Sequence, residues 1–243
     1  MQQTLPLDNP AARLHALLTA LQKQESAGRP IMDAWAAVLG ANRASINEEM
    51  AGVAALLNDL KRVVERIDDP TTTQMYRHYM PEWSRSVLSP GSSWGAGSNG
   101  LVDVGALATL GGLATLLSVM GSEGSIPDEQ SVADLRESLE SALAEVRADG
   151  GLPPEVRRLL VARLHDMLWA IDHLNVMGPE GVKAAAERLA GAVAVSSDLR
   201  RSGPVVTKVL EVAGRLWTAF TFPGQVGEAI EGWNQVKELL PSA

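Results

Sequence analysis

Apolar side chains recur at three- and four-residue steps along nearly the whole chain, and this spacing restricts the fold more than any other feature. In residues 45–67, for example, Met50, Val53 and Leu57 begin a series that continues to Ile67. Positions three and four apart lie on one face of an α-helix. No stretch of comparable length alternates apolar and polar residues as a half-buried strand would. We therefore predict an all-α fold, an irregular multi-helix bundle of about eight to ten helices.

Proline, asparagine, aspartate and glycine mark where these helices begin and end. Asn9-Pro10 predicts the first start, because proline fits the first helical turn, and Gly40 predicts the end of a short helix that opens at Pro30. Pro81 predicts a break that divides the segment after Pro70 into two short helical pieces. The other predicted helices cover residues 10–24, 45–67, 101–120, 128–148, 153–174, 179–195, 204–220 and a last segment that ends near Leu240.

Glycine and serine crowd residues 91–100, and this is the strongest interruption of the helical pattern. We predict a loop or a domain boundary there, with an N-terminal helical region over 1–90 and a C-terminal helical bundle over 101–243. At 243 residues the chain is long enough for one domain or for two smaller ones, so a single domain is the alternative.

Residues 101–120 form an apolar segment with a single charge, Asp103. Twenty residues at about 1.5 Å each could cross a bilayer core of about 30 Å. Glycine, threonine and serine dilute the segment, however, and the nearest basic residues that could orient it are as far away as Arg85 and Arg136. A helix that is apolar all round is central in a soluble protein. We therefore predict a buried central helix that does not span a membrane.

Composition and charge exclude several classes of function. The chain has no cysteine, which excludes disulfides, thiolate nucleophiles and cysteine-ligated metals. The N-terminus lacks the basic and apolar segments of a secretory signal, so the cytoplasm is the expected location. The net charge is −8, and residues 123–150 contribute eight acids against two arginines. No basic footprint for phosphate is present, and we expect no binding to nucleic acid.

The most suggestive polar cluster lies on the predicted helix over 153–174. His165 and Asp172 are seven residues apart, as are Asp166 and His173, so each pair shares a helix face. Two helical turns separate the members of each pair by about 10 Å. A metal or an acid–base pair would therefore need a further group from another helix. We interpret the four as surface residues flanking a core tryptophan, and we predict no catalytic residue, no metal and no other cofactor.

Two tryptophans and one acidic helix are candidates for contact with a partner. Trp83 and Trp94 lie in or beside segments of weak periodicity, where an aromatic side chain either binds a partner or, more commonly, covers the end of a bundle. The predicted helix over 128–149 could bind a basic partner through its outward acids, although a charged face is most often simply hydrated. These acids are Glu137, Glu140 and Glu145.

Residues 152–195 contain a helix opened by LPPEVRRLL, a G-x-E-G loop, and a second helix with the sequence GPEGVKAAAERLAGAV from 178 to 193. This pattern resembles uncharacterised bacterial helical proteins, and the segment DAWAAVLG at 33–40 adds to the resemblance. The resemblance implies a helical hairpin and a bacterial origin. It implies no assigned activity, so no functional residue follows from it.

The absence of a reactive cluster favours a protein that works by binding. We predict a non-enzymatic bacterial interaction protein, such as a regulatory, immunity-type or defence-associated helical subunit with a protein partner. The first alternative is a membrane-active effector that uses residues 101–120. The second is a hydrolase whose site is assembled from distant helices.

Overall fold

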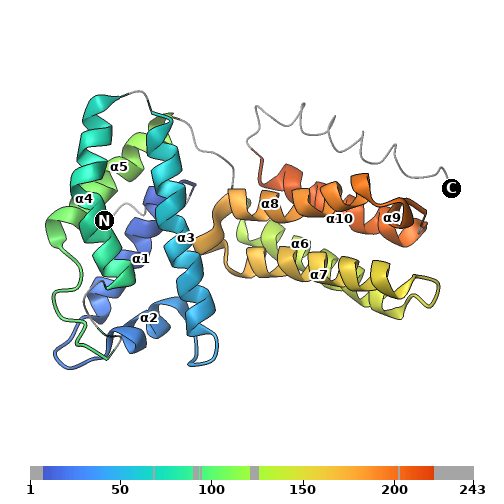
Figure 1. The fold of residues 1–243 in the computed structure, drawn as a ribbon, viewed down its shortest axis with the longest axis horizontal. Coiled ribbons are helices and arrows are strands. Elements are labelled where there is room, and N and C mark those ends of the chain that lie inside the picture. The colour runs from blue at the N-terminus through green and yellow to red at the C-terminus, as the bar shows by residue number, and fades with distance from the viewer. Residues whose placement is uncertain are drawn as a thin grey trace. The chain divides into compact units, whose positions relative to one another are not determined.

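The computed structural model describes residues 8–67, 69–89, 93, 95–120, 126–201 and 203–221. Within these ranges it contains ten α-helices and no strand, which confirms the predicted all-α fold (Figure 1). The helices are α1 (Pro10–Gln24), α2 (Ile31–Leu39), α3 (Ile46–Glu65), α4 (Pro70–Leu88), α5 (Val104–Met120), α6 (Glu129–Ala148), α7 (Pro154–Asp172), α8 (Leu174–Val195), α9 (Ser197–Arg201) and α10 (Pro204–Ala219).

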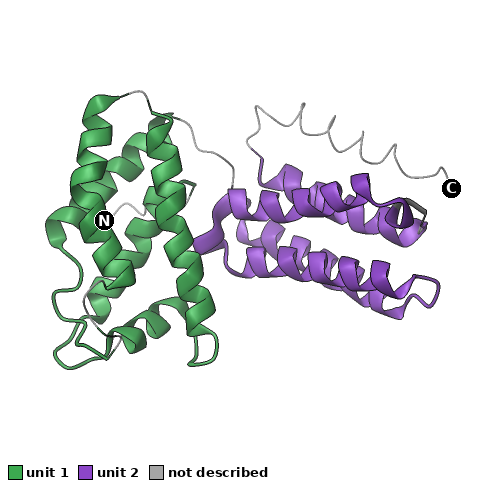
Figure 2. Ribbon diagram, in the orientation of Figure 1, with its two compact units in different colours: residues 1–122 green, residues 123–243 purple. Residues whose placement is uncertain are grey.

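The chain divides into two compact units, residues 1–122 and 123–243 (Figure 2). The described part of 91–100 is a loop, as predicted, but the division falls later in the chain, between α5 and α6. Two observations explain the difference. Helix α5 packs against α1 and α4, and the loop is bonded to the α1–α2 connection, because Ile31 N–H donates to Ala96 O at 3.0 Å and Ser98 N–H to Arg29 O at 2.8 Å.

In the first unit, α1 is the helix with the largest share of buried residues. It packs against α2, α3 and α5, and α4 packs against α3 and α5. Asn9 caps α1 as predicted, since its Oδ1 accepts from Ala12 N–H at 2.9 Å. Its Nδ2 also donates to Ala114 O at 3.2 Å and to Ser118 Oγ at 3.0 Å on α5. One residue therefore begins α1 and holds it to α5.

Helix α4 continues through Pro81, so the predicted break is wrong. Proline removes one backbone donor and crowds the preceding turn. Here the proline ring is exposed, whereas Tyr76 before it and Trp83 after it are both buried in the unit. Packing on each side of the proline holds the two halves in one helix.

Only one side of α5 is buried, which corrects the prediction of a central helix covered all round. Leu110 and Leu113 have no exposed surface, whereas Val104 is 68% exposed and Val119 is 81% exposed. Asp103 lies just before the helix, where its Oδ1 accepts from Ala106 N–H at 2.7 Å. Among the described residues, no helix has both the length and the hydropathy needed to cross a bilayer.

Helices α1 and α5 approach each other closely where His15 meets Gly111. A Cβ atom placed on Gly111 would lie 3.1 Å from Nε2 of His15, so the glycine leaves room for the imidazole ring. At this position a glycine therefore lets the two helices pack closely. Burial lowers the pKa of His15 from its ordinary value of 6.5.

We expect His15 to lower the free energy of unfolding in mild acid. Below pH 6.5 the unfolded chain protonates His15, whereas the folded chain resists protonation until a lower pH is reached. The free energy of unfolding should therefore fall between pH 6.5 and the lowered pKa and then level off. Urea unfolding of the wild type and of His15→Gln, from about pH 7.5 to pH 5, measures this, because the variant should lack that part of the decline. Parallel declines in both proteins would contradict it.

The second unit is a four-helix bundle in which α6 packs against α7 and α10, and α8 packs against the same two helices. Short connections between consecutive helices make neighbours run antiparallel (Figure 1). Its core is aliphatic and includes the fully buried Leu164, Leu189 and Leu210. The five-residue helix α9 was not predicted.

The predicted helical hairpin over 152–195 is present, and a glycine forms a kink in its second helix. Helix α7 ends at Asp172, and the segment of α8 contains Gly178 with φ 63° and ψ −178°, directly before Pro179. Gly203 precedes Pro204 with φ 71° and ψ −149°. This region of backbone conformation is essentially restricted to glycine. The predicted helix start at Pro204 is therefore confirmed, whereas the one at Pro179 lies at a kink within α8, which already begins at Leu174.

Candidate interaction surface

The four polar residues predicted as a cluster on α7 do not come together. His165 Nε2 lies 2.9 Å from Nη2 of Arg147 on α6, so this nitrogen is the acceptor. Asp166 Oδ2 lies 2.8 Å from Arg163 Nη1 and 3.8 Å from Nη1 of Arg188 on α8. These two residues hold α7 to different neighbouring helices.

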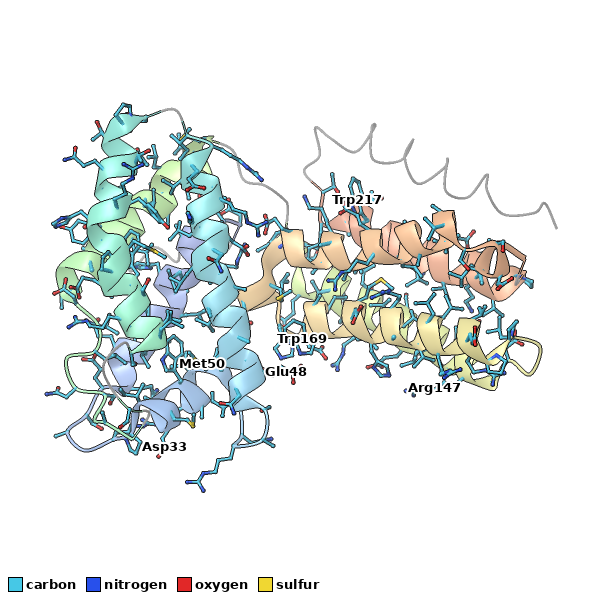
Figure 3. All side chains as sticks on the ribbon, in the orientation of Figure 1. Asp33, Glu48, Met50, Arg147, Trp169 and Trp217 are labelled. Atoms are coloured by element: carbon cyan, nitrogen blue, oxygen red, sulfur yellow. The ribbon has the colours of Figure 1, made fainter. Side chains whose placement is uncertain are left out.

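The other two residues of the predicted cluster also have partners of their own. Asp172 Oδ1 lies 3.2 Å from Nε of Arg136 on α6. His173 stacks on the half-buried Trp169 with ring centroids 4.3 Å apart, and its Nδ1 donates to the Trp169 carbonyl at 2.7 Å. Figure 3 places Trp169 and Arg147 toward opposite ends of the bundle. In the described ranges, no group of three or more His, Asp and Glu side chains could hold a metal ion.

The two predicted tryptophans have different outcomes. Trp83 is only 1% exposed and donates its indole N–H to Ala106 O at 2.8 Å. It packs α4 against α5 and is therefore a core residue in this structure, with almost no ring surface exposed. Trp94 lies outside the described residues.

The acidic face of α6 is partly used inside the second unit. Glu140 Oε1 lies 3.4 Å from Arg136 Nε, and Glu145 forms an ion pair with Lys208 on α10. Glu137 is exposed and has no ion pair within the described part of the chain. Two of the three acids predicted to meet a basic partner thus already have a cation beside them.

We expect these acids to differ in their effect on stability. Glu145→Lys places a second ammonium beside Lys208 and should lower the free energy of unfolding by up to about 1 kcal/mol. Glu137→Lys, the matched control on the same helix, should change it by less than about 0.5 kcal/mol. Urea unfolding at low and high salt measures both, and the gap between the variants should narrow at high salt. Equal effects at low salt would contradict the role given to the Glu145–Lys208 pair.

The pocket between α3 and α4 gives little support for a hydrolytic site. Asp69 caps α4 by accepting from Thr71 N–H at 3.4 Å and from Thr72 N–H at 2.8 Å, and the Thr72 hydroxyl donates to it as well. The hydrogen bonds from Thr72 lower the pKa of Asp69, so this carboxylate is poorly suited to act as a general acid. The pocket has a volume of about 340 Å³ and is lined by Ile67, Asp69, Pro70, Thr73, Gln74 and Arg77.

The exposed side of α5 is the most unusual surface of the described chain. Six large apolar side chains are exposed among the described residues, and four of them lie on this one helix, the others being Leu88 and Val195. Thr109 at its border and Thr115 within it donate their hydroxyls to carbonyls of the preceding turn at 2.9 and 3.0 Å. We define the α5 outer face as the exposed residues of the helix: Val104, Gly105, Ala108, Gly112, Thr115, Leu116, Val119 and Met120.

The α5 outer face also differs from the other surfaces in charge. Helix α5 is the only helix of the described chain that has no charged residue. Contiguous exposed apolar surface of this kind marks interaction sites on soluble domains. The sequence showed that residues 101–120 are apolar on all sides, but it could not show which side the rest of the unit would leave uncovered.

Comparison with known proteins does not assign a function to this surface. No family model matches the chain, and no curated protein or solved structure is significantly similar to it. This agrees with the expectation that the helical-hairpin resemblance leads to no named family of known activity. The function is therefore argued from the α5 outer face.

Proposed function

We propose that the protein is a non-enzymatic bacterial interaction protein of the cytoplasm, a regulatory, immunity-type or defence-associated helical subunit, and that its α5 outer face binds a protein. The supporting observation is the concentration of exposed apolar side chains on a helix without charge. Covering this face would remove Val104, Val119 and Met120 from water, and apolar burial contributes about 25 cal/mol per Å². A protein surface that is itself apolar and uncharged fits it best.

The two alternatives have weaker support. A membrane-active effector would use the same residues, yet α5 has no lysine or arginine to attract anionic lipid headgroups. A hydrolase would need a base beside a nucleophile, whereas His165 and His173 are each engaged with a neighbouring side chain or carbonyl.

Affinity capture from bacterial cells tests the proposal with two matched variants. Val119 on the α5 outer face is 81% exposed, and Val195 at the end of α8 is 84% exposed. Val119→Lys should lower the amount of captured partner protein at least tenfold relative to the wild type, because burial of a lysine ammonium opposes binding. Val195→Lys should retain it at the wild-type level. Equal retention by both variants would contradict the assignment of the α5 outer face.

Vesicle sedimentation distinguishes a protein partner from a lipid surface. The purified full chain is mixed with neutral and with anionic phospholipid vesicles and is then centrifuged. The proposal predicts that the protein stays in the supernatant with both. Sedimentation with the vesicles that Val119→Lys abolishes would replace the proposal with the membrane-active alternative.

A further inference from the structure

Gly112 lies in the middle of the α5 outer face, and the packing of its own unit does not require it. A Cβ atom placed on Gly112 meets no atom within 4 Å, whereas one on the neighbouring Gly111 would press on His15. Glycine in an exposed helix interior weakens the helix relative to alanine. Its use at position 112 is explained if another backbone approaches α5 closely from outside the unit.

The side chains of the α5 outer face are arranged so that the face complements itself. Small residues, Gly105 and Ala108, lie on the N-terminal side of Gly112, and the larger Leu116 and Val119 lie at the matching distances on the C-terminal side. When two such helices run antiparallel and cross at Gly112, each small residue comes level with a large one. Pairing of small with large side chains is what close packing between helices needs.

Charge also favours an identical partner at this face. The chain carries a net charge of −8, so two copies repel each other at most contacts. In a two-fold interface the same patch meets itself, which brings like charges together wherever the patch is charged. The α5 outer face has no charged side chain, so this contact avoids that repulsion.

We propose that the α5 outer face binds the same face of a second copy of the chain, antiparallel, with the two-fold axis at Gly112. Ala108 of one copy then lies level with Leu116 of the other, and Val104 with Met120. This inference rests on the proposed function, because it names the protein that covers the face. Seventeen residues make a helix of about 25 Å, and one helix pair covers less than the roughly 800 Å² per partner of a standard interface, so we expect a weak dimer that forms at high protein concentration.

Sedimentation velocity on the full chain tests the dimer. The most informative substitution is one that should stabilise the folded chain but weaken its association. Gly112→Ala should raise the melting temperature of the dilute protein, because alanine favours the helix and meets no atom of its own chain. The same substitution should weaken dimerisation several-fold, because two methyl groups then meet at the axis. Val195→Ala is the control and should leave dimerisation unchanged. A wild type that stays monomeric up to several hundred micromolar, or a Gly112→Ala dimer as tight as the wild type, would overturn the proposal.

Cysteine cross-linking tests the register, since the natural chain has no cysteine. Ala108→Cys mixed with Leu116→Cys should form a disulfide dimer far faster than Ala108→Cys mixed with Val195→Cys, because positions 108 and 116 come level across the axis. Val104→Cys should cross-link to Met120→Cys in a mixture and not to itself. Self-linking of Val104→Cys would indicate parallel helices and overturn the proposed arrangement.

Failure of this inference and failure of the proposed function give different results. If the full chain is monomeric while Val119→Lys still loses a captured protein, the face binds another protein and only the dimer is wrong. If Val119→Lys neither alters the oligomeric state nor loses a captured protein, the α5 outer face is not an interaction surface, and both are wrong.

Discussion

Replacing Trp83 with alanine is expected to lower the free energy of unfolding by about 3 to 5 kcal/mol, the range for removing a large aromatic side chain from a packed core. The indole ring is almost fully buried between α4 and α5, and its N–H donates to Ala106 O at 2.8 Å. It also lies near Tyr76, with ring centroids 6.1 Å apart. Its loss would leave a cavity that the two helices cannot close without moving.

Urea unfolding followed by circular dichroism measures this effect, and Trp217→Ala provides the comparison. Trp217 is half-buried on α10 and donates its indole N–H to Glu187 Oε1 at 2.9 Å. Because part of its ring is already in water, its loss should cost clearly less than the loss of Trp83. A Trp83→Ala protein destabilised by less than about 1 kcal/mol would contradict the core position of this residue.

Gly178→Ala is expected to be the second most damaging change, with a cost of about 1 to 3 kcal/mol from backbone strain alone. The conformation at Gly178, with φ 63° and ψ −178°, places a Cβ in conflict with its own backbone. Because Gly178 and Pro179 are both buried at the kink near the start of α8, the chain has little freedom to relax there.

Gly191→Ala is the matched control on the same helix. Gly191 is exposed within α8, and a Cβ atom placed on it meets no atom within 4 Å. Alanine there should stabilise the protein by up to about 1 kcal/mol through helix propensity. Thermal unfolding should therefore move in opposite directions for the two variants. Shifts of the same sign would contradict the strained kink.

The positions of most helices could be predicted because they depend on local signals. Asn9 and Asp128 cap helices as their residue types predict, and Gly40 ends α2 in the left-handed conformation with φ 64°. Pro81 was misjudged because packing of distant residues overrides a local preference. The division of the chain after α5 could not be predicted either, since it depends on which helices α5 contacts.

The candidate site was harder to predict than the fold, for a related reason. The exposed fraction of Val104 or Val119 depends on how many helices surround α5, and sequence periodicity carries no such information for a helix that is apolar on all sides. Trp83 was a candidate for partner contact because a proline two residues earlier predicted irregular structure. The acids of α6 were recognised as a group. The pair of Glu140 with Arg136 is local, because the two residues are four apart on α6, whereas the pair of Glu145 with Lys208 on α10 follows from tertiary packing.

Thiol labelling inside cells tests most directly whether the α5 outer face is covered by a partner. Because the chain has no cysteine, Val119→Cys and Val195→Cys each introduce a single reactive thiol at similarly exposed positions. In dilute purified protein, a membrane-permeable maleimide should react with both at similar rates. In cells, we predict that Val119→Cys reacts at least several-fold more slowly than Val195→Cys, and equal rates there would show that nothing covers the α5 outer face.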